Sequence, residues 1–182
     1  MVLKKLVISA AAASVILATA SYFSPHWTVY RMRVAIEKRD YKAFSSHADF
    51  PALRASFKRQ LGAGDGVPAT EAHAGGNVLD WLGREIAGLV TSPMIDSLVG
   101  PAAVMEMLNA GVPGLNRNVI TSALTRVPAA GEAMPKMEID YRGWQRAAFR
   151  DAEASDKDGS FILVRSGWWS WRLAEVELPQ RP

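Results

Sequence analysis

Hydrophobic positions are continuous near the start of the chain and periodic further on. Residues 6–20 form an apolar run without a charged side chain, and Lys4 and Lys5 precede it. A short basic segment followed by such a run is typical of export signals. The positive-inside rule then keeps Lys4 and Lys5 in the cytoplasm and sends the rest of the chain across the membrane. We therefore expect a periplasmic location.

Two interpretations of this run remain open. Ala18 and Ala20 form the small-x-small pattern that a signal peptidase reads, so cleavage after Ala20 would release a soluble protein. Alternatively the run extends to Phe23 and stays in the inner membrane, because about 20 apolar residues can span a bilayer. Residues 1–23 are thus predicted to be a signal peptide or an N-terminal membrane anchor, and residues 24–182 a single envelope domain.

The middle of the chain shows helical periodicity with clear start signals. Ser24-Pro25 is expected to end the first helix or to restart the chain, and Asp40 and Asp49 stand where helix N-caps are favoured. The Gly-rich residues 62–77 are expected to form a flexible linker. We expect helices over residues 27–39, 41–47, 51–61, 78–91, 92–99 and 101–109, and a helical turn over 119–124.

The last part of the chain alternates as strands do. Strands are expected over residues 136–144, 145–153, 160–165 and 168–178. In the last of these the apolar phase changes, and a one-residue slip near Ala174 would reconcile it, so a β-bulge is predicted there. The fold class is therefore α+β: N-terminal helices are followed by a C-terminal antiparallel meander of three to four strands, with the helices packed on one face of the sheet.

Charge and composition exclude several classes of protein. Apart from Lys4 and Lys5, basic and acidic residues are nearly equal in number, which argues against a nucleic-acid partner. The chain has no cysteine, so disulfides, thiolate chemistry and lipoprotein processing are excluded.

Candidate catalytic or metal-binding residues are few. The three histidines, His26, His47 and His73, lie far apart in the sequence without ligand spacing. Nucleophile and phosphate-loop motifs are absent. Asp40 and Asp49 are expected to cap helices. Asp80, Asp96 and Glu106 are expected to face water. We therefore predict no catalytic residue, no metal site and no cofactor.

Tryptophans are the candidates for contact with a ligand or partner. Trp169 and Trp171 share a strand face and are expected in the core, whereas Trp168 is expected to be partly exposed. Trp168, Trp81 and Asp96 are therefore the residues proposed for contact with a ligand or partner.

Several short phrases resemble one family of bacterial envelope proteins, domain of unknown function 2939. They are the SPHW of residues 24–27, the DFPALR of 49–54, the SPMIDSLV of 92–99 and the WRL of 171–173. The resemblance implies export and a single α+β domain, and it transfers no catalytic residue. The order of elements is also similar to that of cone-shaped nuclear-transport-factor-2-like domains, which is an analogy of fold only.

The resulting functional hypothesis is an uncharacterised exported envelope protein whose domain binds a protein partner or an apolar ligand without catalysis. Residues 78–109 would cover the sheet, whose concave face would form a small pocket. One alternative is a structural or interaction module tethered to the membrane by residues 1–23. Another is a small-pocket enzyme that uses helix carboxylates.

Overall fold

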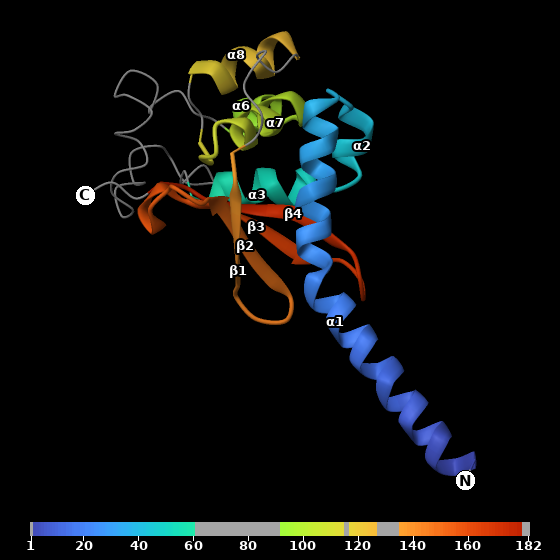
Figure 1. Ribbon diagram of the computed structural model, residues 1–182. Helices are drawn as coiled ribbons and strands as arrows, with labels where there is room; N and C mark the ends of the chain where they lie inside the picture. The colour runs from blue at the N-terminus through green and yellow to red at the C-terminus, as the bar shows by residue number, and fades with distance from the viewer. Residues whose placement is uncertain (1, 61–91, 115–116, 127–134, 180–182) are drawn as a thin grey trace.

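The structure is a computed structural model that describes residues 2–60, 92–114, 117–126 and 135–179. Helices occupy the N-terminal part of the chain, and one antiparallel sheet follows (Figure 1). The α+β prediction is therefore confirmed. The predicted linker at 62–77, the predicted helix at 78–91 and the candidate contact residue Trp81 lie outside the described residues.

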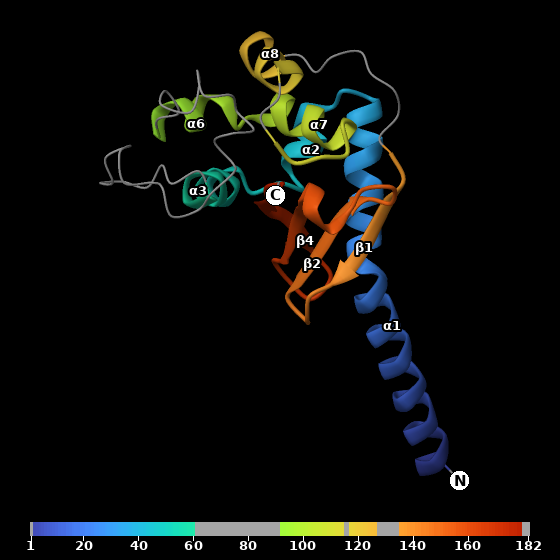
Figure 2. The ribbon, with the colours of Figure 1, turned by 90° about the vertical axis from the view of Figure 1, so that its left-hand side faces the viewer.

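The first element is a single long helix, α1 (Val2–Glu37), with Pro25 inside it. Its N-terminal half projects away from the other elements, and its C-terminal half packs against them (Figures 1 and 2). The expected break at Ser24-Pro25 is wrong. A proline removes one helical hydrogen bond and usually kinks or ends a helix, but here the hydroxyl of Ser24 replaces the lost donor.

Two capped helices follow, as predicted. In α2 (Tyr41–Ser45) the Asp40 carboxylate accepts a hydrogen bond from the backbone N–H of Ala43 at 2.9 Å. In α3 (Phe50–Gln60) the Asp49 carboxylate accepts one from Ala52 at 3.1 Å. Both aspartates therefore satisfy helix N-termini.

Three further helices contact α2, α3 and one another. They are α6 (Ser92–Leu98), α7 (Pro101–Asn109) and α8 (Arg117–Thr125). Proline stands in the first turn of α6 and at the start of α7, where its missing N–H needs no helical partner. Every residue from Ala102 to Leu108 is buried, so α7 is a core helix on all sides.

The sheet is a four-stranded meander in the order β1-β2-β3-β4. Its strands are β1 (Met137–Tyr141), β2 (Arg146–Asp151), β3 (Ser160–Arg165) and β4 (Trp171–Glu177). Ile162 pairs with Glu175 while Leu163 pairs with Leu173, which leaves Ala174 as an extra residue. The predicted bulge is confirmed. In contrast, β4 begins at Trp171 instead of Trp168.

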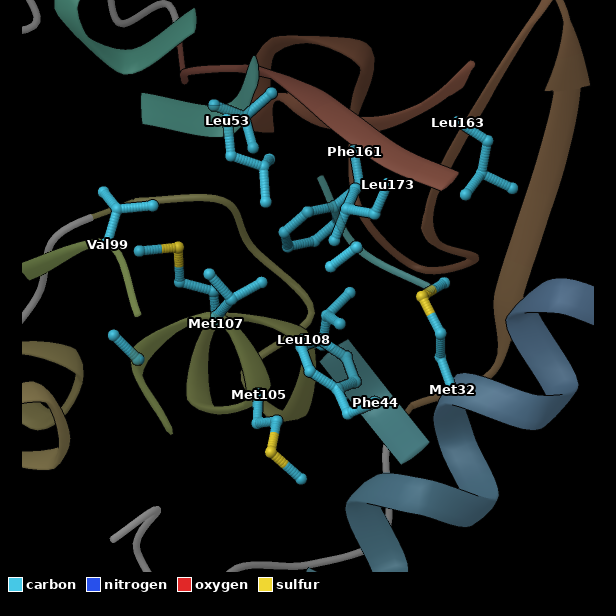
Figure 3. Close-up of a cluster of buried hydrophobic side chains, with 14 of the residues drawn as sticks. Met32, Phe44, Leu53, Val99, Met105, Met107, Leu108, Phe161, Leu163 and Leu173 are labelled. Carbon is cyan, nitrogen blue, oxygen red and sulfur yellow. The ribbon is translucent and has the colours of Figure 1, made fainter. Parts of the chain in front are cut away.

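The core lies between the sheet and the helices (Figure 3). Phe161 and Leu173 from the sheet meet Phe44, Leu53 and the α7 side chains, all fully buried. These side chains occupy the helix-facing side of the sheet, and part of the expected cover, residues 78–91, lies outside the described residues.

Candidate functional site

The N-terminal half of α1 is exposed on every side that the structure describes. The large apolar side chains there all expose more than half of their surface: Val7, Ile8, Val15, Ile16 and Leu17. In the described part of the chain, α1 alone has the length and apolar composition needed to cross a membrane. Ala18 and Ala20, the predicted cleavage residues, lie exposed inside this unbroken helix.

The character of α1 changes at Ser21. Ser21, Ser24 and Thr28 are buried, one helical turn apart, on the face that meets the sheet. Pro25 has no N–H to donate to the carbonyl of Ser21. The Ser24 hydroxyl donates to that carbonyl instead, at 2.7 Å, and it accepts a hydrogen bond from Trp171 Nε1, also at 2.7 Å. Ser24 thus keeps the helix continuous and joins it to β4.

Tyr141, the last residue of β1, makes the second junction. Its ring stacks on Tyr22 with centroids 4.6 Å apart, and its hydroxyl donates to the Tyr22 carbonyl. Burial, and then the neighbouring Tyr22, raise the pKa of Tyr141, and Arg165 opposes this shift. The phenol therefore stays protonated and remains a donor. His26 Nδ1 lies 3.3 Å from the same hydroxyl oxygen.

Arg165 ties both hairpin loops to the helix. Its Nε donates to the Trp144 carbonyl at 2.9 Å, and a terminal nitrogen donates to the Trp168 carbonyl at 2.7 Å and to Ser21 Oγ at 3.0 Å. Its guanidinium carbon lies 4.4 Å from the ring centroids of both Trp144 and Trp171, within cation–π range. Ser21 Oγ also donates to the Trp168 carbonyl at 3.2 Å.

Around these junctions, large aromatic side chains remain exposed. We call them the aromatic collar; they are Tyr22 and Phe23 of α1, Trp144 of the β1–β2 loop, and Trp168 and Trp169 of the β3–β4 loop. A hollow of about 320 Å³ lies within the collar, lined by Trp144, Gln145, Arg165, Gly167 and Trp168. Aromatic rings thus form its walls, and one cation lies among them.

The structure separates three tryptophans that the sequence places close together. Trp168 is 77% exposed, and the expected core residue Trp171 is 2% exposed. Trp169 is 46% exposed, so its expected place in the core is wrong. The cause is the hairpin loop: the N–H of Ser166 donates to the carbonyl of Ser170 at 2.8 Å, and Trp169 falls inside this loop, before β4 begins.

The carboxylates singled out from the sequence lie apart from the collar. Asp96 is exposed and pairs with Lys58 at 2.9 Å, which links α6 to α3. Glu106 was expected to face water but is buried, because α7 has no solvent-facing side along this stretch. Asp80 lies outside the described residues. Within the residues that the structure describes, no group of three His, Asp or Glu side chains could hold a metal ion.

Two other cavities lie on the helical side of the molecule. One of about 290 Å³ is lined by residues of α2, α6, α7 and α8: Tyr41, Ser97, Gly100, Pro101, Ala102, Ala103, Ala123 and Arg126. A groove of about 400 Å³ runs between α1 and α2 and contains Trp27, Tyr30, Arg31, Lys38 and His47. Burial lowers the pKa of His47, and the cations Arg31 and Arg172 lower it further.

Comparison with families of known proteins gives a match to part of the chain. A family model described as a protein of unknown function (DUF2939) matches residues 14–107, just over half of the chain. The match begins in the exposed half of α1, crosses Ala20 and ends in α7. It therefore contains the turn of α1 from Ser21 to Ser24 that contacts the sheet, but not the sheet itself. No curated protein and no solved structure matches the chain. The analogy to nuclear-transport-factor-2-like domains therefore stays a prediction.

Proposed function

The chain belongs to the DUF2939 family of proteins of unknown function, and we propose that it acts as a membrane-anchored, non-catalytic interaction domain on the periplasmic side of the inner membrane. Helix α1 stays attached as the anchor. The observation that carries this proposal is the position of Ser24, which bonds both to the Ser21 carbonyl and to Trp171 of the sheet. The anchor and the domain then form one continuous piece.

The junction supports retention of α1 over cleavage after Ala20. Cleavage would turn Ser21 into a free amino terminus. Ser21 is buried, and its hydroxyl donates to the Trp168 carbonyl and accepts from Arg165. Proteolytic sites concentrate in exposed loops, whereas Ala18–Ala20 is the interior of a helix. Cleavage would also remove the helical turn that precedes the first contacts with the sheet.

The side of the membrane follows from charge. Lys4 and Lys5 precede the apolar half of α1, and the positive-inside rule keeps such residues in the cytoplasm. The folded elements after Ser21 would then lie on the periplasmic side.

The non-catalytic part of the proposal rests on what the carboxylates already do. Asp40 and Asp49 accept helix-capping hydrogen bonds, and Asp96 forms an ion pair with Lys58. A general acid or base needs a carboxylate free to meet substrate. These three instead stabilise helices or hold one helix against another.

The test is the mass of the mature protein recovered from the envelope fraction of a Gram-negative host. We expect a chain that begins at Met1 and requires detergent for extraction. A matched variant, A18L/A20L, removes the small residues that signal peptidase reads. It should also begin at Met1, and its mass should exceed that of the wild type only by the two substitutions. A wild-type chain that begins at Ser21, together with a variant that begins at Met1, would contradict the proposal.

The cavity next to α8 favours a second candidate function, which we propose as binding of a small apolar ligand with an acidic group. Its volume, about 290 Å³, is close to the lower limit of ligand pockets. Its lining is mainly alanine, glycine and proline, and its polar residues are Tyr41, Ser97 and Arg126. This lining fits a short hydrocarbon chain, and Arg126 fits a carboxylate.

Hexanoate and hexanol are suitable probes because they differ mainly in charge. We expect the full chain to bind hexanoate more tightly than hexanol in calorimetry, and A123W to abolish binding of both by filling the cavity. R126Q should weaken hexanoate alone. Equal binding of hexanoate by wild type and A123W would rule this cavity out as the site.

A further inference from the structure

Given the anchored state proposed above, on which this inference rests, we propose that the aromatic collar inserts into the interfacial layer of the lipid leaflet on the domain's side. The partner of the two hairpin loops is then the bilayer surface itself, at the level of the lipid headgroups and glycerol backbones. The collar consists, as defined above, of Tyr22, Phe23, Trp144, Trp168 and Trp169.

The length of α1 places the collar at the right level. The apolar stretch from residue 6 to 23 has 18 residues. At about 1.5 Å of rise per residue it is about 27 Å long, close to the hydrocarbon thickness of about 30 Å. With Lys5 at the cytoplasmic interface, Tyr22 and Phe23 reach the opposite one.

Two contacts place the hairpin loops at that same level. Ser21 Oγ bonds to the carbonyl of Trp168, and the hydroxyl of Tyr141 bonds to the carbonyl of Tyr22. The loops therefore lie beside the helical turn at which the apolar stretch ends. Three tryptophans and this end of the span meet although they come from segments more than a hundred residues apart in the chain.

The topology of the sheet supports the orientation. In an antiparallel meander the β1–β2 and β3–β4 loops share one end of the sheet, and the β2–β3 connection lies at the other. The β1–β2 loop lies at the end from which the apolar half of α1 projects (Figures 1 and 2). The two loops with exposed tryptophans therefore face the membrane, and the 3₁₀ turn Asp156–Asp158 faces away from it.

The chemistry of the collar suits this layer. Tryptophan and tyrosine concentrate at membrane interfaces because each has an apolar ring and a polar group. In water, by contrast, Trp168 and Trp144, 77% and 64% exposed, would leave large apolar surfaces uncovered. The hollow between them holds the guanidinium of Arg165, a group suited to phosphate and ester oxygens.

Spin labels provide a direct test, because the chain has no native cysteine and single cysteines can be introduced without other changes. We choose Q145C and S166C in the two hairpin loops, K157C in the opposite turn as the matched control, and L17C in the apolar half of α1. The full chain is reconstituted in vesicles of phosphatidylethanolamine and phosphatidylglycerol. Collision of each label with oxygen, which concentrates in lipid, is compared with collision with a water-soluble nickel complex.

The expected result is that labels at Q145C and S166C favour oxygen, as L17C does, whereas K157C favours nickel. Adding W144A/W168A/W169A should shift both loop labels toward nickel while L17C stays in lipid. Loop labels that match K157C, with L17C in lipid, would overturn the inference and leave the anchor intact. L17C in water would overturn both proposals. Dipolar broadening between loop labels would show that a second copy of the chain covers the collar, and would also overturn the inference.

Discussion

The two halves of α1 belong to one helix but meet different surroundings. Before Ser21 the described side chains are exposed on all sides. From Ser21 onward a stripe at helical spacing is buried, and it consists of Ser21, Ser24, Pro25, Thr28, Val29, Met32, Ala35 and Ile36. An apolar helix without a wet side suits lipid, and a helix with one buried stripe suits the surface of a domain. The first half of α1 therefore suits lipid, and the second half suits the surface of a folded domain.

Hydroxyl side chains show the same difference more sharply. In the exposed half Ser14 and Thr19 bond to carbonyls four residues earlier, at 2.9 and 2.8 Å. Lipid offers no partners, so polar groups there must be satisfied inside the helix. In the packed half, Ser24 and Thr28 also donate to carbonyls of the helix. There, however, Ser21 donates across to the Trp168 carbonyl, and Ser24 accepts from Trp171 of β4. The comparison teaches that hydrogen bonds within the helix occur in both halves, whereas a hydroxyl that also bonds to another element marks the junction.

The largest expected effect is on the stability of the folded domain, to which the packed half of α1 should contribute and the exposed half should not. Met32 is fully buried between α1 and the sheet, and Ile16 is an exposed residue of the other half. M32A should lower the free energy of unfolding by about 2–5 kcal/mol, the usual range for emptying a core position. I16A should leave it unchanged. Thermal melts of the full chain in detergent measure both, and equal losses would contradict the division of α1.

The next effect is on membrane insertion, which should depend on the exposed half of α1 and not on the packed half. Val15 lies near the middle of the apolar stretch, and Tyr30 is similarly exposed on the packed half. V15R should disfavour membrane insertion by about 2.5–3.5 kcal/mol, which lowers the ratio of inserted to non-inserted chain about a hundredfold. Y30R should insert as the wild type does. Carbonate extraction of membranes reports the inserted fraction, and extraction of V15R and Y30R to the same extent would argue against an anchor.

A smaller effect tests the junction through two serines of the same helix. S24A removes the donor to the Ser21 carbonyl and the acceptor for Trp171 Nε1, so two buried groups lose their partner. The loss should be about 1–3 kcal/mol of unfolding free energy. S14A removes one bond within an exposed turn and should not change the domain's melting temperature. The two variants would melt alike only if Ser24 did not join helix and sheet.

Much of the fold could be predicted because its signals are local. Asp40 and Asp49 precede helices and do cap them, and the phase change near Ala174 does mark a bulge. Two errors have local causes that the sequence conceals. Pro25 normally breaks a helix, but here the Ser24 hydroxyl supplies the donor that the Ser21 carbonyl lacks. Trp169 has the alternation of a strand residue but lies in the loop before β4.

The candidate site could be predicted only in part, because its residues come together over long distances in the chain. The exposure of Trp168 and the burial of Trp171 followed from alternation. The link from Arg165 to Ser21, and the stacking of Tyr141 on Tyr22, depend on how the sheet docks on α1. Nothing in the local pattern around Arg165 or Tyr141 indicates these contacts. The burial of Glu106 was missed for a similar reason, since α7 is covered from several directions.

The smallest expected effect is a dependence on pH that arises at His47, in the groove between the packed half of α1 and α2. Burial, Arg31 of α1 and Arg172 of β4 lower the pKa of His47 below its usual 6.5. The unfolded chain therefore takes up a proton at a higher pH than the folded chain, and stability falls as the pH drops through 6.5 toward the folded pKa.

H47Q keeps the backbone hydrogen bond from the N–H of Leu173 to the carbonyl of residue 47, but its side chain cannot titrate. Above pH 6.5 the melting curves of wild type and H47Q should keep a constant offset, and below it the wild type should lose stability relative to H47Q. An offset that stays constant over the whole range would show that the contact between α1 and α2 does not respond to the charge on His47.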